Sequence, residues 1–212
     1  MLTELTESVE TQLGIPGDSM DAAARDPELL DALGARGRTL EGYLYPTTYF
    51  VRVGVTAREL IAHMVSEFEA HWDPAWTERL QELRMTRDEI VTLASIIEGE
   101  ARHPEDLAYV SSVYHNRLNR RMRLQADPTV VYALGRRRRL FTRDYQIDSP
   151  YNTYQIDGLP PHPIGQPSAA ALHAALHPRP SDFLFFVAGS DGRHIFSRTY
   201  REHLAAIRRI RE

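Results

Sequence analysis

The sequence predicts an α+β fold in which helices dominate and one small antiparallel hairpin supplies the sheet. In three places before residue 120, a helix-start signal precedes apolar residues at helical spacing. Near the C-terminus, two short runs rich in aromatic and β-branched residues, 183–188 and 194–197, are joined across Gly189-Ser190-Asp191-Gly192. This arrangement is typical of a β-hairpin. A set of helices with a separate strand pair indicates the α+β class.

The composition allows one substantial domain and excludes several kinds of protein. The chain has 212 residues, of which 42% are hydrophobic, and its net charge is -4. This charge balance suggests neither a nucleic-acid binder nor a disordered acidic tail. With no cysteine, disulfides, Cys-ligated zinc and a thiol nucleophile are excluded. The longest apolar run, 183–188, is far shorter than the roughly 20 residues of a membrane-spanning helix, so we expect the chain as given to be soluble.

The first part of the chain differs from the rest in amino-acid composition. Residues 1–36 are polar and rich in alanine, and helix breakers divide them into two short helical stretches. From Gly37 onward, aromatic and β-branched residues become frequent. We therefore predict an N-terminal arm or connector over 1–36 and a main domain over 37–212.

Capping signals mark the helices of the main domain. Thr56 with Glu59, and Thr86 with Glu89, form two capping boxes, and Pro104 is suited to the first turn of a third helix. The predicted helices end near residues 72, 100 and 118. In the second of them, apolar residues recur on one side, which indicates a single apolar stripe.

Helix signals also organise the second half of the chain. Residues 129–134 are predicted to form a short helix. Asp127 before it is predicted to be the N-cap, and Pro128 to take the N1 position. The proline-rich segment 149–167 is predicted to be an extended loop. Two further helices are predicted at 168–177 and 200–212.

Glu98 is the strongest candidate for chemistry. On the helical wheel it lies about 20° from Val91 and about 40° from Ala94, at the edge of the apolar stripe. Partial burial there would raise its pKa, so that a protonated carboxyl could act as a general acid. Glu100 lies about 200° further round the helix and is not expected to share the site. From periodicity alone, a glutamate at the border of an apolar stripe is more often a solvated surface residue than a catalytic acid, so this interpretation of Glu98 stays open.

A second catalytic carboxylate is not evident in the sequence. Ordinary glycosidases use two carboxylates, and no second acid lies near Glu98 on its own helix. Asp127, Asp148 and Asp157 could approach through the fold, but helix capping already explains Asp127. A reaction that needs one carboxyl, such as attack by a hydroxyl of the sugar itself, fits better.

Other polar groups suit carbohydrate rather than metal or phosphate. The segment 149–154 combines amide, hydroxyl and aromatic groups, as a sugar-binding groove requires, although a proline-rich surface connection explains it equally well. His173 and His177 lack a third metal ligand, and 136–139 reads as a solvated run of arginines. We predict neither a metal nor a cofactor.

Taken in order, these segments resemble the YceG-like (MltG) family of endolytic murein transglycosylases. The resemblance covers nearly all of residues 40–207 and rests on ordered motifs rather than on a single one. The matching segments are 40–49, 93–101, 113–118 with 122–130, 149–154, 158–164, and 194–197.

The resemblance implies a function and a set of site residues. Glu98 would protonate the oxygen between N-acetylmuramic acid and N-acetylglucosamine, then take the proton of the muramyl C6 hydroxyl as a 1,6-anhydro end forms. Such cleavage would limit the length of nascent glycan strands. It also implies substrate-binding or stabilising roles for a further set of residues, namely Tyr151, Asn152, Gln125, Tyr154 and Glu41.

It further implies partners and a location. The substrate would be peptidoglycan glycan strands, with peptidoglycan synthases (penicillin-binding proteins) as partners and no nucleic acid. Family members usually carry a membrane anchor and a LysM-like module, and act on the extracytoplasmic, or periplasmic, side of the cell membrane. Because this chain shows no anchor and at most the end of that module in residues 1–36, we expect it to be a fragment.

Two other readings remain open from the sequence. A muramidase could use the same Glu98 to activate water, with Asp148 or Asp157 as the second carboxylate. A glycan-binding scaffold of the wall-synthesis machinery could use the tyrosine- and proline-rich segment without catalysis.

Overall fold

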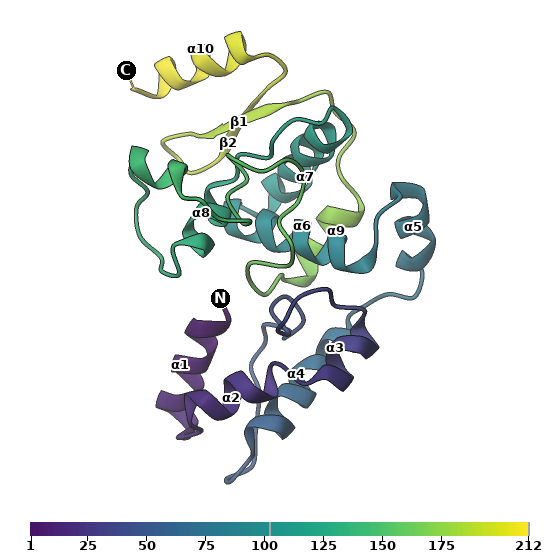
Figure 1. Cartoon of the computed structure of the whole chain (residues 1–212). Coiled ribbons are helices and arrows are strands. Elements are labelled where there is room, and N and C mark those ends of the chain that lie inside the picture. Colours follow the sequence, from purple (N-terminus) through teal and green to yellow (C-terminus); the bar gives the residue numbers. More distant parts are fainter. Residues whose placement is uncertain (102, 212) are drawn as a thin grey trace.

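The computed structural model of the protein describes residues 1–101 and 103–211. Four helices form one end of the molecule (Figure 1): α1 (Leu2–Leu13), α2 (Gly17–Ala23), α3 (Pro27–Leu33) and α4 (Ala57–Ala70). The other end holds α6 (Arg87–Glu100), α7 (Pro104–Asn119), α8 (Asp127–Ala133), α9 (Ala169–Leu176), the hairpin and α10 (Tyr200–Arg211). The predicted α+β class with dominant helices is confirmed.

Helix α6 is the centre of the larger end. It packs against α7, α8 and α9, and its residues from Ile90 to Ile97 are all buried. The prediction of a single apolar stripe on this helix is therefore wrong. An isolated helix next to one partner needs one apolar stripe, but a helix surrounded by three others buries every side. Its start is confirmed, because Thr86 and Glu89 form the predicted capping box.

The hairpin packs on α7, and the last helix packs on the hairpin. Strand β1 (Phe185–Ala188) pairs antiparallel with β2 (His194–Ser197), with Phe185 opposite Ser197. Helix α10 contacts both strands (Figure 1). The predicted strands and C-terminal helix are confirmed, with β1 starting two residues later than expected; Glu212 lies outside the described residues.

The N-terminal end contains more helix than the sequence suggested. Three helices replace the two predicted stretches, because Gly14 ends α1 in the left-handed conformation and Asp26 caps α3. Helix α5 (Trp76–Leu83) and a 3-10 helix, η1 (Thr142–Gln146), were not predicted. The N-caps of both lack a side-chain capping bond, so the usual start signal is missing.

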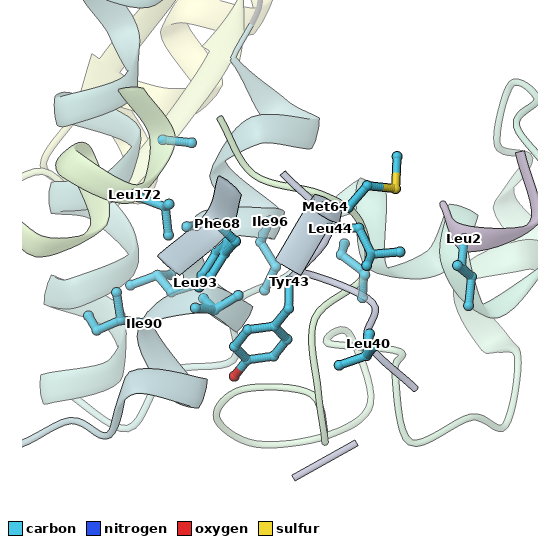
Figure 2. Close-up of a cluster of buried hydrophobic side chains, with 14 of the residues drawn as sticks. Leu2, Leu40, Tyr43, Leu44, Met64, Phe68, Ile90, Leu93, Ile96 and Leu172 are labelled. Atoms are coloured by element: carbon cyan, nitrogen blue, oxygen red, sulfur yellow. The ribbon is translucent and has the colours of Figure 1, made fainter. Parts of the chain in front are cut away.

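One hydrophobic core joins the two ends. Leu2 of α1 belongs to the same buried cluster as Phe68 of α4 and Leu93 of α6 (Figure 2). Tyr43 lies in the middle of this cluster, with its ring 5.1 Å from that of Phe68. Its buried hydroxyl donates a 2.7 Å hydrogen bond to the Asp88 carboxylate at the start of α6. Residues 1–36 are thus packed against the main domain, and the proposed boundary at residue 37 stays a prediction.

Within the described part of the chain, no helix combines the length and the apolar character that crossing a membrane requires.

Candidate active site

Glu98 does not lie in the partly buried environment predicted for it. Its side chain is exposed, although Val91 and Ala94 on the same side of α6 are fully buried. Its carboxylate accepts hydrogen bonds from the backbone N–H and the hydroxyl of Ser168, at 3.1 and 2.6 Å. The prediction failed because a wheel angle gives the direction of a side chain but not how far the covering elements extend. Glu98 lies in the last turn of α6, beyond that cover.

Ser168 explains what this carboxylate does in the fold. It is the N-cap of α9, and its hydroxyl accepts a 3.2 Å hydrogen bond from the backbone N–H of Ala171. A carboxylate is favourable at a helix N-terminus, where it meets free N–H groups and the positive end of the helix dipole. Glu98 therefore fastens the end of the proline-rich loop, and the start of α9, to α6.

Glu100 is the perturbed carboxyl of this region. Its side chain is partly buried, and Oε1 accepts a 2.9 Å hydrogen bond from the hydroxyl of Tyr114 on α7. Burial raises the pKa of Glu100 from an ordinary 4.5 to about 7. The Tyr114 hydrogen bond lowers this pKa, whereas the negative charge of Asp127 raises it. A carboxyl with a pKa near neutrality can both give and take a proton at physiological pH.

Close packing at the end of α6 brings Glu100 and Asp127 together. A Cβ atom at Gly99 would lie 2.7 Å from Cβ of Pro128, so the missing side chain allows α8 to approach α6. The backbone amide of Asp127 also acts on the Glu100 carboxyl, lowering its pKa.

Asp127 is not the N-cap of α8, contrary to the prediction. Ala126 occupies that position, and Asp127 is the first helical residue. Its carboxylate instead accepts a 2.7 Å hydrogen bond from Tyr154 and a 3.4 Å one from Tyr145. The capping motif could not reveal these partners, because both tyrosines arrive from later segments of the chain.

Two cavities meet at this pair of acids. One, of about 930 Å³, is open on one side and lies next to the hairpin and α10, and Gln125 and Tyr154 line it. The other, of about 420 Å³, lies towards the N-terminal helices, and Glu98 and Tyr132 line it. Gly99, Glu100 and Asp127 line both. Glu98 and Glu100 thus share a cavity that crosses the end of the helix, so the expectation that Glu100 could not share the site is wrong.

Gln125 and Tyr154 are the predicted site residues that accompany Glu100 in the larger cavity. Gln125 has a left-handed backbone, with φ of 49°, and its N–H donates to the carbonyl of Thr153 at 3.1 Å. Arg117 donates to its side-chain oxygen at 3.4 Å. A strained non-glycine residue held from two sides is typical of functional sites.

Asn152 and Tyr151 lie away from this group. Asn152 is fully buried, and its amide donates to the carbonyls of Tyr145 and Ile147 at 3.1 and 2.8 Å. Its side-chain oxygen accepts from the backbone N–H of Tyr154 at 3.1 Å. The Tyr151 ring lies 4.8 Å from that of Tyr132, and its hydroxyl bonds to His162. Asn152 therefore shapes the loop that presents Tyr154.

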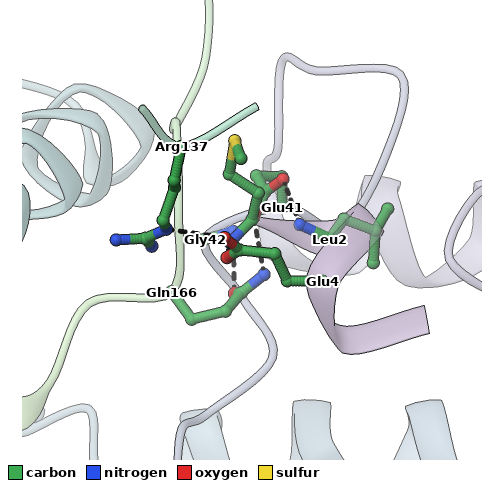
Figure 3. A network of polar contacts seen from close by, with 7 residues as sticks. Leu2, Glu4, Glu41, Gly42, Arg137 and Gln166 are labelled. Atoms are coloured by element: carbon green, nitrogen blue, oxygen red, sulfur yellow. Dashed lines mark hydrogen bonds and ion pairs between the residues drawn. The ribbon is translucent and has the colours of Figure 1, made fainter. Parts of the chain in front are cut away.

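Glu41 is buried at the junction between the two ends of the molecule (Figure 3). It accepts hydrogen bonds from the backbone N–H of Leu2 at 2.7 Å and from the amide of Gln166 at 2.9 Å. Burial raises the pKa of Glu41. Arg137 pairs with Glu4 at 2.6 Å beside it. In this arrangement Glu41 ties the N-terminal helices to the loop before α9.

Asp148 and Asp157 do not accompany Glu98. Asp148 is exposed, and Asp157 is paired with Arg123 at 3.1 Å on the surface. Neither is among the described residues that line the two cavities.

The contact between Glu100 and Tyr114 was not predicted from the sequence. Tyr114 is buried on α7. A buried tyrosine hydroxyl usually needs a polar partner. That requirement was the available signal for a second, buried acid at the end of α6.

Comparison with known proteins identifies relatives along almost the whole chain. The model of the YceG-like family matches residues 2–209. The endolytic murein transglycosylase of Bacillus subtilis (strain 168) is 39% identical over 166 residues, which are 77% of this chain and 46% of that protein. The endolytic murein transglycosylase of Streptococcus pneumoniae serotype 2 (strain D39) is 34% identical over 194 residues, 86% of this chain and 35% of that protein. The chain thus spans less than half the length of these relatives.

A solved structure shares the fold. A yceG-like protein from Listeria monocytogenes superposes with a TM-score of 0.87 at 35% sequence identity. The match covers 97% of this chain and 72% of that one.

Proposed function

This chain belongs to the YceG-like family, and from this premise we propose that it is an endolytic lytic transglycosylase of peptidoglycan with Glu100 as its acid and base. The observation that carries the assignment is the environment of Glu100: a partly buried carboxyl, bonded to Tyr114 and with its pKa raised to about 7, where two cavities meet.

The proposed reaction moves one proton out and one proton back. Protonated Glu100 donates to the glycosidic oxygen between N-acetylmuramic acid and N-acetylglucosamine, and the C1–O bond breaks with its electron pair on the leaving oxygen. The C6 hydroxyl of the same muramic acid then forms a bond to C1, and its proton passes to the Glu100 carboxylate. The acid form is restored, a 1,6-anhydro end forms, and no water is consumed.

The pKa of Glu100 suits both halves of this cycle. A carboxyl with a pKa of about 7 is protonated in a large fraction of molecules at neutral pH, yet it becomes an effective base once it has lost its proton. Tyr114 helps the first half, because its hydrogen bond stabilises the ionised carboxylate that remains after Glu100 has given up its proton.

Two cavities that meet at the acid suit a polymer cut within its length. A strand lying across both cavities would pass Gly99, Glu100 and Asp127, with sugars on each side of the scissile bond. Gln125 and Tyr154 supply an amide and an aromatic hydroxyl to the larger cavity, as recognition of N-acetyl sugars requires. We propose substrate contacts for these two residues. Tyr151, Asn152 and Glu41 are proposed to support the shape of the site.

Purified glycan strands test the proposal directly. The wild-type protein should release 1,6-anhydro ends, detected by mass spectrometry, and Glu100→Gln should abolish them. Glu98→Gln is the matched comparison, because Glu98 lies two residues earlier on the same helix. This variant should retain cleavage. If Glu98→Gln abolishes cleavage and Glu100→Gln does not, the assignment made from the sequence holds instead.

A hydrolase is the second candidate function. It is favoured by one observation, the nearness of the Asp127 carboxylate to Glu100, since glycosidases that use water need two carboxylates. Reducing ends without the anhydro bond in the same digests would select the hydrolase.

We place this activity on the extracytoplasmic side of the bacterial cell membrane, where nascent glycan strands emerge. The proposed partners are the peptidoglycan synthases that make those strands. Chemical cross-linking in growing cells, followed by identification of the attached proteins, should recover a penicillin-binding protein.

A further inference from the structure

Asp127 is the acidic residue that the proposed reaction has left unused. It lines both cavities, as Glu100 does, so a substrate that spans them must pass its side chain. No ion pair with a basic side chain is found for Asp127 among the described residues. Among those residues, the partners of its carboxylate are tyrosine hydroxyls.

Two tyrosines hold this carboxylate in place. The hydroxyl of Tyr154 donates to Oδ1 at 2.7 Å, and that of Tyr145 donates to Oδ2 at 3.4 Å. The two rings pack edge to face, with centroids 4.6 Å apart, so each steadies the other. Because Tyr145 and Tyr154 approach different oxygens, the carboxylate cannot turn without losing one of them.

Charge develops on the sugar at this place in the proposed reaction. As the C1–O bond breaks, positive charge builds on C1 and on the ring oxygen before the C6 hydroxyl closes the new bond. A fixed negative charge beside that centre lowers the barrier, because the interaction is stronger in the transition state than in the ground state.

We propose that Asp127, held by Tyr154 and Tyr145, is a second catalytic residue that stabilises the positively charged sugar while Glu100 transfers the protons. This inference rests on the proposed function and extends it to the charge balance of the same site. It assigns no bond to Asp127: the residue forms none with the sugar and exchanges no proton.

Other ionisable groups also face Glu100, and they must be considered in a pH experiment. Tyr114 and Arg117 face it from α7, and Tyr154 faces it from the loop. Three histidines, His103, His194 and His203, line the same cavity. Removing the charge of Asp127 leaves all of these in place, so a change specific to Asp127 can be recognised.

Asp127→Asn is the first test, because it removes the charge with almost no change of shape. Asp157→Asn, on the exposed surface beside Arg123, is the matched control. We expect the asparagine variant at position 127 to lose activity on glycan strands by about 100-fold or more. Its pH profile should also change: the fall in rate with rising pH should begin at lower pH, because the charge of Asp127 raises the pKa of Glu100. The control should match the wild type in both respects.

A second variant guards against a folding defect. Tyr154→Phe removes one hydroxyl and leaves the charge at 127, but it releases one of the two bonds that hold the carboxylate. It should fold and slow turnover by about 10-fold, with a smaller change of the pH profile.

The outcomes separate this inference from the proposed function. If Asp127→Asn keeps the wild-type rate and pH profile while Glu100→Gln is inactive, the role of Asp127 is refuted and the proposed function stands. A rate loss without any change of the pH profile, together with an unaffected Tyr154→Phe, would also refute it, since that pattern indicates a structural role. If the wild type forms no anhydro ends, the proposed function itself fails.

Discussion

The hydroxyl of Tyr114 donates a hydrogen bond of 2.9 Å to Oε1 of Glu100. This contact opposes the larger effect of burial, which raises the pKa of the carboxyl, while the nearby charge of Asp127 adds to that rise. The balance leaves the pKa of Glu100 at about 7, in the range where one group can serve as acid and then as base.

The rate of cleavage should fall as the pH rises through about 7, because the protonated form of Glu100 is then lost. The measurement is the initial rate of anhydro-end formation on purified strands between pH 5 and pH 9. A rate that stays level across this range would show that Glu100 is not the proton donor.

Tyr114→Phe should move this fall to higher pH. The lost hydrogen bond favours the ionised carboxylate, so without it the pKa of Glu100 rises further. The maximum rate should also drop by about 10-fold, since the ionised intermediate loses a partner. Tyr109→Phe is the control on the same helix, because that ring packs against Phe196 and away from the acid. An unchanged or lower pH for the fall would contradict the role given to Tyr114.

Glu100→Gln should stabilise the fold at neutral and alkaline pH. Because the pKa is raised in the folded state, its favourable contribution is complete below about 4.5 and is lost as the pH rises through about 7. At about 1.4 kcal/mol per pKa unit, the wild type should lose up to about 3 kcal/mol relative to the variant. Urea unfolding at pH 5 and pH 8 measures this, with Glu98→Gln as the exposed comparison. A difference that does not grow with pH would mean that the Glu100 carboxyl is not buried in solution.

Glu98→Gln and Ser168→Ala should each reduce stability by about 1 kcal/mol, because together they hold the start of α9. The double variant should cost less than the sum of the two, since both changes remove the same contact. Urea unfolding of the four proteins gives the coupling energy. Full additivity would mean that the Glu98–Ser168 contact contributes nothing in solution.

Asn152→Ala should destabilise the protein by about 1 to 3 kcal/mol, because the Ile147 carbonyl loses its Asn152 donor and the Tyr145 carbonyl loses one of two side-chain donors. Gln155→Ala is the control, because Gln155 is exposed although it donates to the same Tyr145 carbonyl at 3.0 Å. A variant as stable as the wild type, but with a raised KM, would show that Asn152 contacts the substrate instead.

Local signals were sufficient for most of the elements. The capping boxes at Thr56 and Thr86 each predicted the start of a helix, and the glycine-containing turn over residues 189–192 predicted the hairpin. Such signals act within a few residues of the chain, so the sequence carries them in full. Helix α5 was not predicted, because no side-chain cap marks its start.

The proposed site could be predicted only in part, because its members come from distant segments. Periodicity correctly placed acids at the end of α6, but it selected Glu98 and set Glu100 aside. The difference between them depends on what covers each side chain. Tyr114 from α7 and the start of α8 close over Glu100, whereas Glu98 stays exposed although it is bonded to Ser168.

By itself, the sequence determined the family, the α+β class, most helix and strand positions, and the presence of an acidic helix end. Tertiary structure decided which carboxyl is perturbed, and that Asp127 faces two tyrosines rather than capping a helix. The physical reason is that helix starts and turns are set by neighbouring residues, whereas a pKa depends on burial and on charges brought close by packing. Those contacts exist only once α6, α7, α8 and the loop before α9 have come together.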